Sequence, residues 1–391
     1  MRPDGAEADR RREVRAAARG WRRASAIDDA TLAAIRASYP DDRGRLGPAF
    51  RSLAFVLTAL ALNAAFFFVI AVADPRGDAV GILALAFGIV LCALTEVQIG
   101  LLKRAEGGIE AATAFVGIAY VIGAAGWLMN EAHMPERTLV LAVLALAAAL
   151  LAAAAARWGM PLCAALAAGA FFLLLARSPA GRLFWIAAAA AAAPLLVIFG
   201  DSPRLPPVHR RSCQAALAVA LLAFYAAFNL WSWDHAFVES LGPGRAPALK
   251  DSSLRPLAMA GTVLIPTAAL AFGIRSRRRL FLDLGVVLAV ASLVTLRFYV
   301  HVAPLWLILT AGGSAAILGS LAIRRFLDSG AGRERRGFTA EPLFEDLSRQ
   351  GALETAAALA SAPSARRVPA EDRSFTSGGG RFGGGGATGE Y

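Results

Sequence analysis

The chain has 391 residues, of which 57% are hydrophobic and only 18% are charged. A soluble globular domain is usually about 45–50% apolar and about 25% charged. The charged residues gather at the two ends, and the long middle of the chain carries few of them. This distribution excludes an ordinary soluble domain and is typical of a chain that crosses a bilayer, whose centre disfavours charge.

The net charge of +11 does not indicate nucleic acid binding, because the basic residues flank apolar runs. Only Lys103 and Lys250 are lysines, and the bias toward Arg and Ala is typical of a GC-rich bacterial genome. The three cysteines form neither a disulfide framework nor a CxxC metal pattern. The first apolar run begins too late for a secretory signal, since a long polar segment precedes it.

Residues 1–51 are predicted to form a basic cytosolic arm. Within the arm, AIDDATLAAIRASYP predicts a short amphipathic helix that Asp28 or Asp29 caps and that ends before Pro40. Basic residues beside a membrane are attracted to anionic lipid by about 1 kcal/mol each. Anionic lipid is therefore the predicted partner of the arm.

Ten apolar runs follow, each of about 18–23 residues and long enough to cross about 30 Å of hydrocarbon. They are residues 52–73, 79–101, 109–130, 138–156, 159–176, 182–199, 212–232, 255–274, 280–300 and 302–323. Alanine inserts only marginally, so the Ala-rich fourth to sixth runs leave open a count as low as eight. The predicted fold class is an all-α, polytopic transmembrane helix bundle of about ten helices, formed by residues 52–323.

The positive-inside rule predicts that both ends lie in the cytoplasm. An even number of spans with the N-terminus inside places most of the 40 Lys and Arg residues on the inner side. The two termini decide this orientation, because the loops alone differ little. The predicted location is the bacterial inner membrane.

Beyond the last run, residues 324–362 predict a cytosolic helical segment and residues 363–391 a disordered Gly-rich tail. The helical segment is the predicted contact for a protein partner.

Three carboxylates near the predicted inner rim are candidate sites for an ion or a proton: Glu96, Glu110 and Asp283. Arginines and a lysine accompany them, so the simpler interpretation is a set of ion pairs at the headgroup layer.

Three of the four histidines fall on the predicted outer side, and carboxylates accompany them. If the ends of their helices converge, His133, His235 and His301 are candidate ligands of a metal or members of a proton-linked site. Their spacing matches no defined metal signature, and the simpler interpretation is that short loops at a membrane surface are polar.

Asn63 and Tyr120 are the notable polar residues near the middle of a span. Each either hydrogen-bonds to another helix or lines a pathway through the bundle.

No catalytic motif is present: the sequence lacks HExxH, GxSxG and an aspartyl dyad, and its Gly-rich tail lacks the GK[ST] of a P-loop. We therefore expect no enzyme activity and no cofactor.

The segment AIDDATLAAIRASYPDDRGRLGPAFRSLAFVLTALALN resembles in layout the opening of the domain of unknown function 2157 family, whose members are multi-pass bacterial membrane proteins. ADPRGD stands where that family has an asparagine–tryptophan pair. The terminal SFTSGGGRFGGGGATGEY is similar to the tails of bacterial membrane proteins that carry a TPM domain. Neither resemblance implies an activity or functional residues.

Two functions remain compatible with the sequence. The first is a non-enzymatic scaffold or interaction protein, favoured by two soluble ends on one side and by the absence of midplane charge. The second is a transporter or channel for a small or lipid-like substrate, favoured by many small residues and two proline-containing spans.

Overall fold

The computed structural model describes residues 3–23, 26–40, 48–100, 108–178, 180–202, 204–241, 255–299, 305–329, 334–335 and 338–339. The chain divides into two compact units, residues 1–341 and residues 342–391. The second unit lies outside the described residues, as does most of the predicted helical segment 324–362 and all of the predicted tail.

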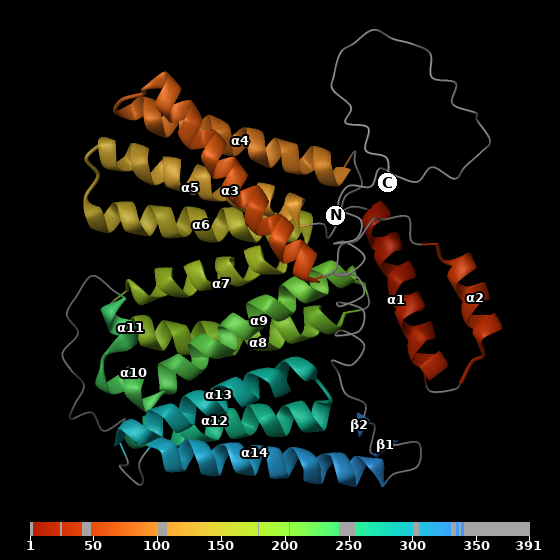
Figure 1. Cartoon of the computed structure of the whole chain (residues 1–391). Helices are drawn as coiled ribbons and strands as arrows, with labels where there is room; N and C mark the ends of the chain where they lie inside the picture. The colour runs from red at the N-terminus through yellow and green to blue at the C-terminus, as the bar shows by residue number, and fades with distance from the viewer. Residues whose placement is uncertain are drawn as a thin grey trace, which may run out of the picture. The chain divides into compact units, whose positions relative to one another are not determined.

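A helix overlaps each of the ten predicted apolar runs (Figure 1). These helices are α3 (Pro48–Ala73), α4 (Asp78–Gly100), α5 (Ile109–Glu131), α6 (Glu136–Trp158), α7 (Pro161–Ala176), α8 (Gly181–Asp201), α9 (Pro207–Phe228), α12 (Arg255–Ser276), α13 (Arg279–Tyr299) and α14 (Leu305–Asp328). Two short strands, β1 (Glu334–Arg335) and β2 (Phe338–Thr339), form an antiparallel pair after α14.

Within the described part of the chain, eight helices are long and apolar enough to cross a membrane: α3, α4, α5, α6, α8, α9, α12 and α13. Helix α7 is apolar but has only 16 residues, which at 1.5 Å per residue is about 24 Å and short of a full crossing. The predicted all-α membrane bundle is confirmed at this level. The count of ten and the cytoplasmic position of both ends stay predictions.

Small residues let α4 and α5 approach closely. A Cβ atom added to Gly88 would lie 2.8 Å from the carbonyl oxygen of Gly117, so neither position has room for a side chain. Further along, alanines of α6 and α7 pack with Ile118 of α5, and a second apolar cluster joins α7, α8 and α9. Large apolar side chains such as Leu60 and Phe68 of α3 stay exposed, as expected for a surface that faces lipid.

The predicted helix over residues 212–232 does not continue to its end. Helix α9 stops at Phe228, Asn229 is extended, and two short helices follow, α10 (Leu230–Asp234) and α11 (Phe237–Ser240). The apolar pattern of residues 212–232 hid this break, because the polar side chains that support it from α8 and α12 lie far away in the sequence.

The basic arm contains two helices, α1 (Pro3–Arg23) and α2 (Asp29–Ser38). Asp28 is the cap of α2, since its carboxylate accepts a hydrogen bond from the backbone N–H of Thr31 at 2.8 Å. Arg22 of α1 donates two hydrogen bonds to Asp29, at 2.6 and 2.7 Å. Glu13 of α1 pairs with Arg210 of α9 at 2.5 Å, which ties the arm to a membrane helix.

We expect the contact between α1 and α2 to weaken in acid. The hydrogen bonds from Arg22 hold the pKa of Asp29 below its usual value, and those from Thr31 do the same for Asp28. A lowered folded pKa stabilises the fold above the unfolded value of about 3.9, and that stabilisation is lost as the pH falls through the folded pKa. Hydrogen exchange of α2 in the full chain, corrected for intrinsic rates, should therefore speed up below about pH 4.

Asp29→Asn provides the comparison, because an amide cannot titrate. In this variant, hydrogen exchange of α2 should be faster at neutral pH than in the unmodified chain. Its rate should also change less as the pH is lowered. Equal protection of α2 at neutral pH in both proteins would contradict a role for the Arg22–Asp29 contact.

Candidate functional site

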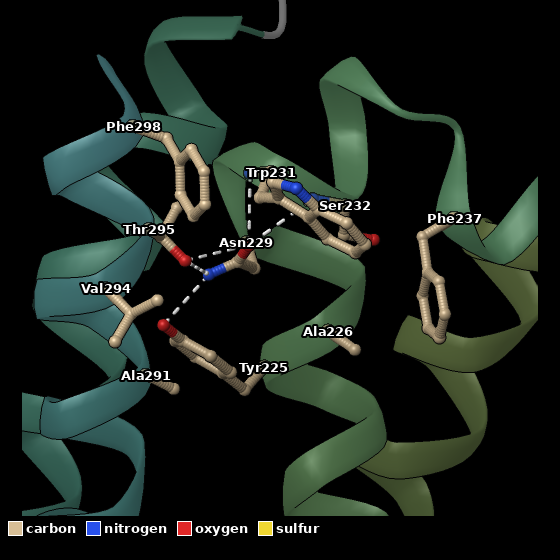
Figure 2. A pocket seen from close by; sticks show the side chains of 10 residues that line it. All are labelled: Tyr225, Ala226, Asn229, Trp231, Ser232, Phe237, Ala291, Val294, Thr295 and Phe298. Atoms are coloured by element: carbon tan, nitrogen blue, oxygen red, sulfur yellow. Dashed lines mark hydrogen bonds between the residues drawn. The ribbon is translucent and has the colours of Figure 1, made fainter.

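The break after α9 is held by the side chain of Asn229, which is only 6% exposed (Figure 2). Its oxygen accepts hydrogen bonds from the backbone N–H groups of Trp231 at 3.0 Å and Ser232 at 3.3 Å, and so caps α10. Its nitrogen donates to the hydroxyl oxygens of Tyr225 at 2.9 Å and Thr295 at 3.0 Å. One amide therefore ends α9, starts α10 and joins both to α13.

Helix α12 also supports the break. The hydroxyl oxygen of Thr262 accepts a hydrogen bond from the backbone N–H of Leu230 at 2.9 Å, and the hydroxyl donates to the carbonyl of Ala258 at 2.8 Å. Buried backbone groups outside a helix require such partners, because water cannot reach them. The irregular segment is thus enclosed by protein on its α12 and α13 sides.

Arg182, at the start of α8, binds the end of α9. It is 6% exposed, and its two terminal nitrogens donate to the carbonyls of Ala227 at 2.8 Å and Ser232 at 2.9 Å. Its guanidinium carbon lies 4.4 Å from the ring centroid of Trp233, a cation–π contact. The last carbonyls of a helix lack partners within it and carry partial negative charge, so a cation stabilises them.

The burial of Arg182 is unusual for its position. An arginine at the end of a span ordinarily extends its charge into the headgroup layer. Here the charge turns into the protein, and Trp233 covers it while also donating its indole N–H to the carbonyl of Ala227 at 2.8 Å. A buried ionisable group in such a segment marks a structural or functional centre.

A pocket of about 380 Å³ lies beside the break. Its wall is mostly apolar, and two of the lining side chains, Val294 and Phe298, are largely exposed, at 54% and 64%. Figure 2 shows the ten residues that line it: Tyr225, Ala226, Asn229, Trp231, Ser232, Phe237, Ala291, Val294, Thr295 and Phe298.

The hydroxyl of Ser232 is the unusual polar group of this wall. Ser232 is 2% exposed, and its side-chain oxygen has no hydrogen-bond partner within the described part of the chain. A buried hydroxyl without a partner costs about 1–3 kcal/mol. The surface that the pocket exposes is almost wholly apolar, so the pocket suits an apolar body.

Asn63 and Tyr120, the two polar residues predicted at depth, contact one another. The hydroxyl of Tyr120 donates to the side-chain oxygen of Asn63 at 3.0 Å, which joins α5 to α3. Both residues also line a pocket of about 350 Å³. The pair thus makes the interhelical hydrogen bond that the sequence left open, and a pathway through the bundle stays a prediction.

The carboxylates of the predicted inner rim have partners of their own. Glu96 binds the guanidinium of Arg157, at 2.8 and 3.3 Å, and the indole N–H of Trp158 at 2.9 Å. Glu110 is 5% exposed and accepts a hydrogen bond from the backbone N–H of Gly108 at 3.3 Å. Asp283 is exposed and pairs with Arg279 at 3.3 Å. Glu96 and Asp283 therefore lie in ion pairs at helix ends.

The outer histidines contact backbone in the described structure. A ring nitrogen of His133 lies 2.6 Å from the carbonyl of Glu131, and one of His235 lies 3.0 Å from the carbonyl of Trp231. Over the described ranges, no group of three or more His, Cys, Asp or Glu side chains could hold a metal ion. His301 lies outside the described residues, so the site that would include it stays a prediction.

Sequence reasoning did not find Arg182 or Asn229. In the sequence, Arg182 is one basic residue at the start of an apolar run, and Asn229 lies inside another run. One signal was present in the sequence: NLWSW places an asparagine two and four residues before two tryptophans near the end of a span. Asparagine favours helix caps over helix interiors, so the pattern is compatible with a break.

The eight long apolar helices define a multi-pass integral membrane protein. No family model matches the chain, and no curated protein and no solved structure is significantly similar to it.

Proposed function

We propose that this membrane protein is a non-enzymatic transporter or channel for a lipid-like substrate, which it binds at the break between α9 and α10. One observation carries the proposal: a mostly apolar pocket lies beside the break, and Asn229, which holds the break, is part of its wall. The pocket volume of about 380 Å³ lies within the range of ligand sites. Exposed Val294 and Phe298 make the side of the pocket accessible to molecules dissolved in lipid.

The break itself supports transport over a purely structural role. A continuous α9 would satisfy its own backbone, whereas the break needs Asn229, Thr262 and Arg182 to satisfy it. Transporters commonly bind substrate where a membrane helix is interrupted, since unwound backbone is tolerated there beside a cavity.

Filling this pocket should stop transport. In vesicles of phosphatidylethanolamine and phosphatidylglycerol, reconstituted protein should accelerate the transbilayer movement of a fluorescently labelled phospholipid, followed by dithionite quenching. Ala291 lines the pocket from α13, so Ala291→Phe should lower the protein-dependent rate at least about fivefold, because its ring occupies the substrate volume.

Ala271→Phe is the matched control, because Ala271 is an exposed residue of α12 that does not line the pocket. It should leave the rate unchanged. A rate no faster than that of protein-free vesicles would reject the transport of phospholipid, and equal rates for the two variants would place transport elsewhere in the bundle.

The second candidate is a scaffold of the bacterial inner membrane, and the ordered arm favours it. The pair between Glu13 and Arg210 holds basic α1 against α9, so the arm has a defined base from which to bind anionic lipid. In this proposal both termini are cytoplasmic, and residues 324–362 contact a protein partner. No nucleic acid is involved.

A further inference from the structure

A second pocket lies between α3, α4 and α5, away from the break in α9. Its volume is about 350 Å³. Helix α3 contributes Asn63 and Phe66 to its wall, and α5 contributes Tyr120 and Trp127. The remaining lining residues are small or aliphatic: Val80, Gly81, Ala84, Ala119, Gly123 and Ala124.

The pair of Asn63 and Tyr120 leaves hydrogen-bonding capacity in this pocket. The amide nitrogen of Asn63 has two N–H bonds, and one donates to the carbonyl of Ala59 at 2.7 Å. Among the described residues the other N–H has no acceptor. The hydroxyl oxygen of Tyr120 donates to Asn63 at 3.0 Å and keeps its own lone pairs for a donor. The pair thus offers a ligand one donor and one acceptor.

Two further aromatic rings, those of Phe66 and Trp127, lie in the wall beside this pair, and Phe87 packs on Tyr120 from outside the wall. The rings of Phe66 and Tyr120 have centroids 4.4 Å apart, and Phe87 packs edge-on against Tyr120 at 5.1 Å. Trp127 is held by a hydrogen bond from its indole N–H to the carbonyl of Gly77 at 3.2 Å. Rings fixed in this way give a rigid apolar surface next to one polar point.

Space and charge restrict the ligand further. A Cβ atom added to Gly123 would meet no atom within 4 Å, so the pocket is open at this position. None of its ten lining residues is charged. An ionic headgroup would therefore lose its hydration without gaining a counter-charge.

We propose that this pocket binds a neutral amphiphile with a hydroxyl headgroup and one apolar chain. The hydroxyl donates to Tyr120 and accepts from Asn63, and the chain packs on Phe66 and Trp127. The site does not rest on the proposed transport, because it lies on different helices and needs only binding.

Trp127 makes the site measurable in the purified full-length protein. A monoacylglycerol brominated on its chain should quench tryptophan fluorescence saturably, and Trp127→Phe should remove the saturable part. Asn63→Leu and Tyr120→Phe each delete one hydrogen bond to the ligand, and each should weaken binding about fivefold, the effect of one net bond of about 1 kcal/mol. A brominated fatty acid and a brominated alkane should bind at least about fivefold more weakly for lack of the neutral hydroxyl.

Gly123→Leu should abolish saturable quenching by filling the pocket, and Gly169→Leu is its control. Gly169 of α7 also has open space at its Cβ position and does not line this pocket. The hydroxyl assignment would be overturned if the alkane bound as tightly as the monoacylglycerol. It would also be overturned if Asn63→Leu bound the monoacylglycerol as tightly as the unmodified protein does. Saturable quenching that survives Trp127→Phe would place the ligand elsewhere. If the monoacylglycerol binds but no phospholipid is transported in vesicles, the proposed function is rejected and the binding site is still supported.

Discussion

Replacing Arg182 with methionine is expected to lower the free energy of unfolding by about 3 kcal/mol. Methionine keeps much of the length and volume of the side chain, but it cannot donate to the carbonyls of Ala227 and Ser232. Each buried acceptor left without its charged donor costs about 1–3 kcal/mol. Ala227 keeps the indole N–H of Trp233, which limits the loss. Unfolding in mixed micelles with increasing dodecyl sulfate, followed by circular dichroism, measures this change.

Two further variants separate charge from shape at this position. Arg182→Lys loses the planar fork that reaches two carbonyls at once, so it should be less stable than the unmodified protein. Because it keeps the positive charge, it should lose less stability than Arg182→Met. Arg137→Met removes an exposed arginine of α6 and should change stability by less than about 0.5 kcal/mol. If Arg182→Met proved as stable as Arg137→Met, the guanidinium would not be what holds α8 to the end of α9.

Asn229→Leu should cost about 2–4 kcal/mol and should also abolish transport. Leucine has a similar size, but it leaves the backbone N–H groups of Trp231 and Ser232 without their cap. It also releases the hydroxyls of Tyr225 and Thr295, which hold α9 to α13. The same unfolding experiment measures the stability, and the vesicle assay measures the rate.

A double-mutant cycle with Thr295→Val tests the contact that Asn229 makes across helices. The side chain of Thr295 bonds to that of Asn229, so the two substitutions should be less than additive by about 0.5–1.5 kcal/mol. Thr267→Val is a control for losing a threonine hydroxyl, because Thr267 of α12 is exposed and bonds within its own helix. Full additivity of the Asn229 and Thr295 substitutions would contradict a shared network.

The sequence predicted the helices because a bilayer imposes strong local requirements. A span must be apolar over most of its length and must satisfy its backbone internally, so residues such as those of α4 and α6 reveal a helix without any partner. That α4 and α5 approach closely at Gly88 and Gly117 came from the structure. The end of α9 was predicted wrongly, since the apolar pattern continues past Asn229 while the helix does not.

The candidate sites depended much more on tertiary structure. Asn63 and Tyr120 are each recognisable in the sequence as a polar residue in an apolar run. The sequence does not show that the packing of α3 and α5 brings the Tyr120 hydroxyl to 3.0 Å from the side-chain oxygen of Asn63. Arg182 looked like an ordinary charge at the end of a span. Only the folded chain places it against the carbonyls of Ala227 and Ser232, 45 and 50 residues away.

The sequence by itself thus determined that this chain crosses a membrane and where most of its helices run, because burial in lipid is a property of each segment alone. The tertiary structure decided which polar groups share a pocket and which side chain ends a helix. Hydrogen bonds act over about 3 Å, and the partners of Asn229 and Arg182 come from different helices. Their pairing could therefore be seen only once the helices had packed.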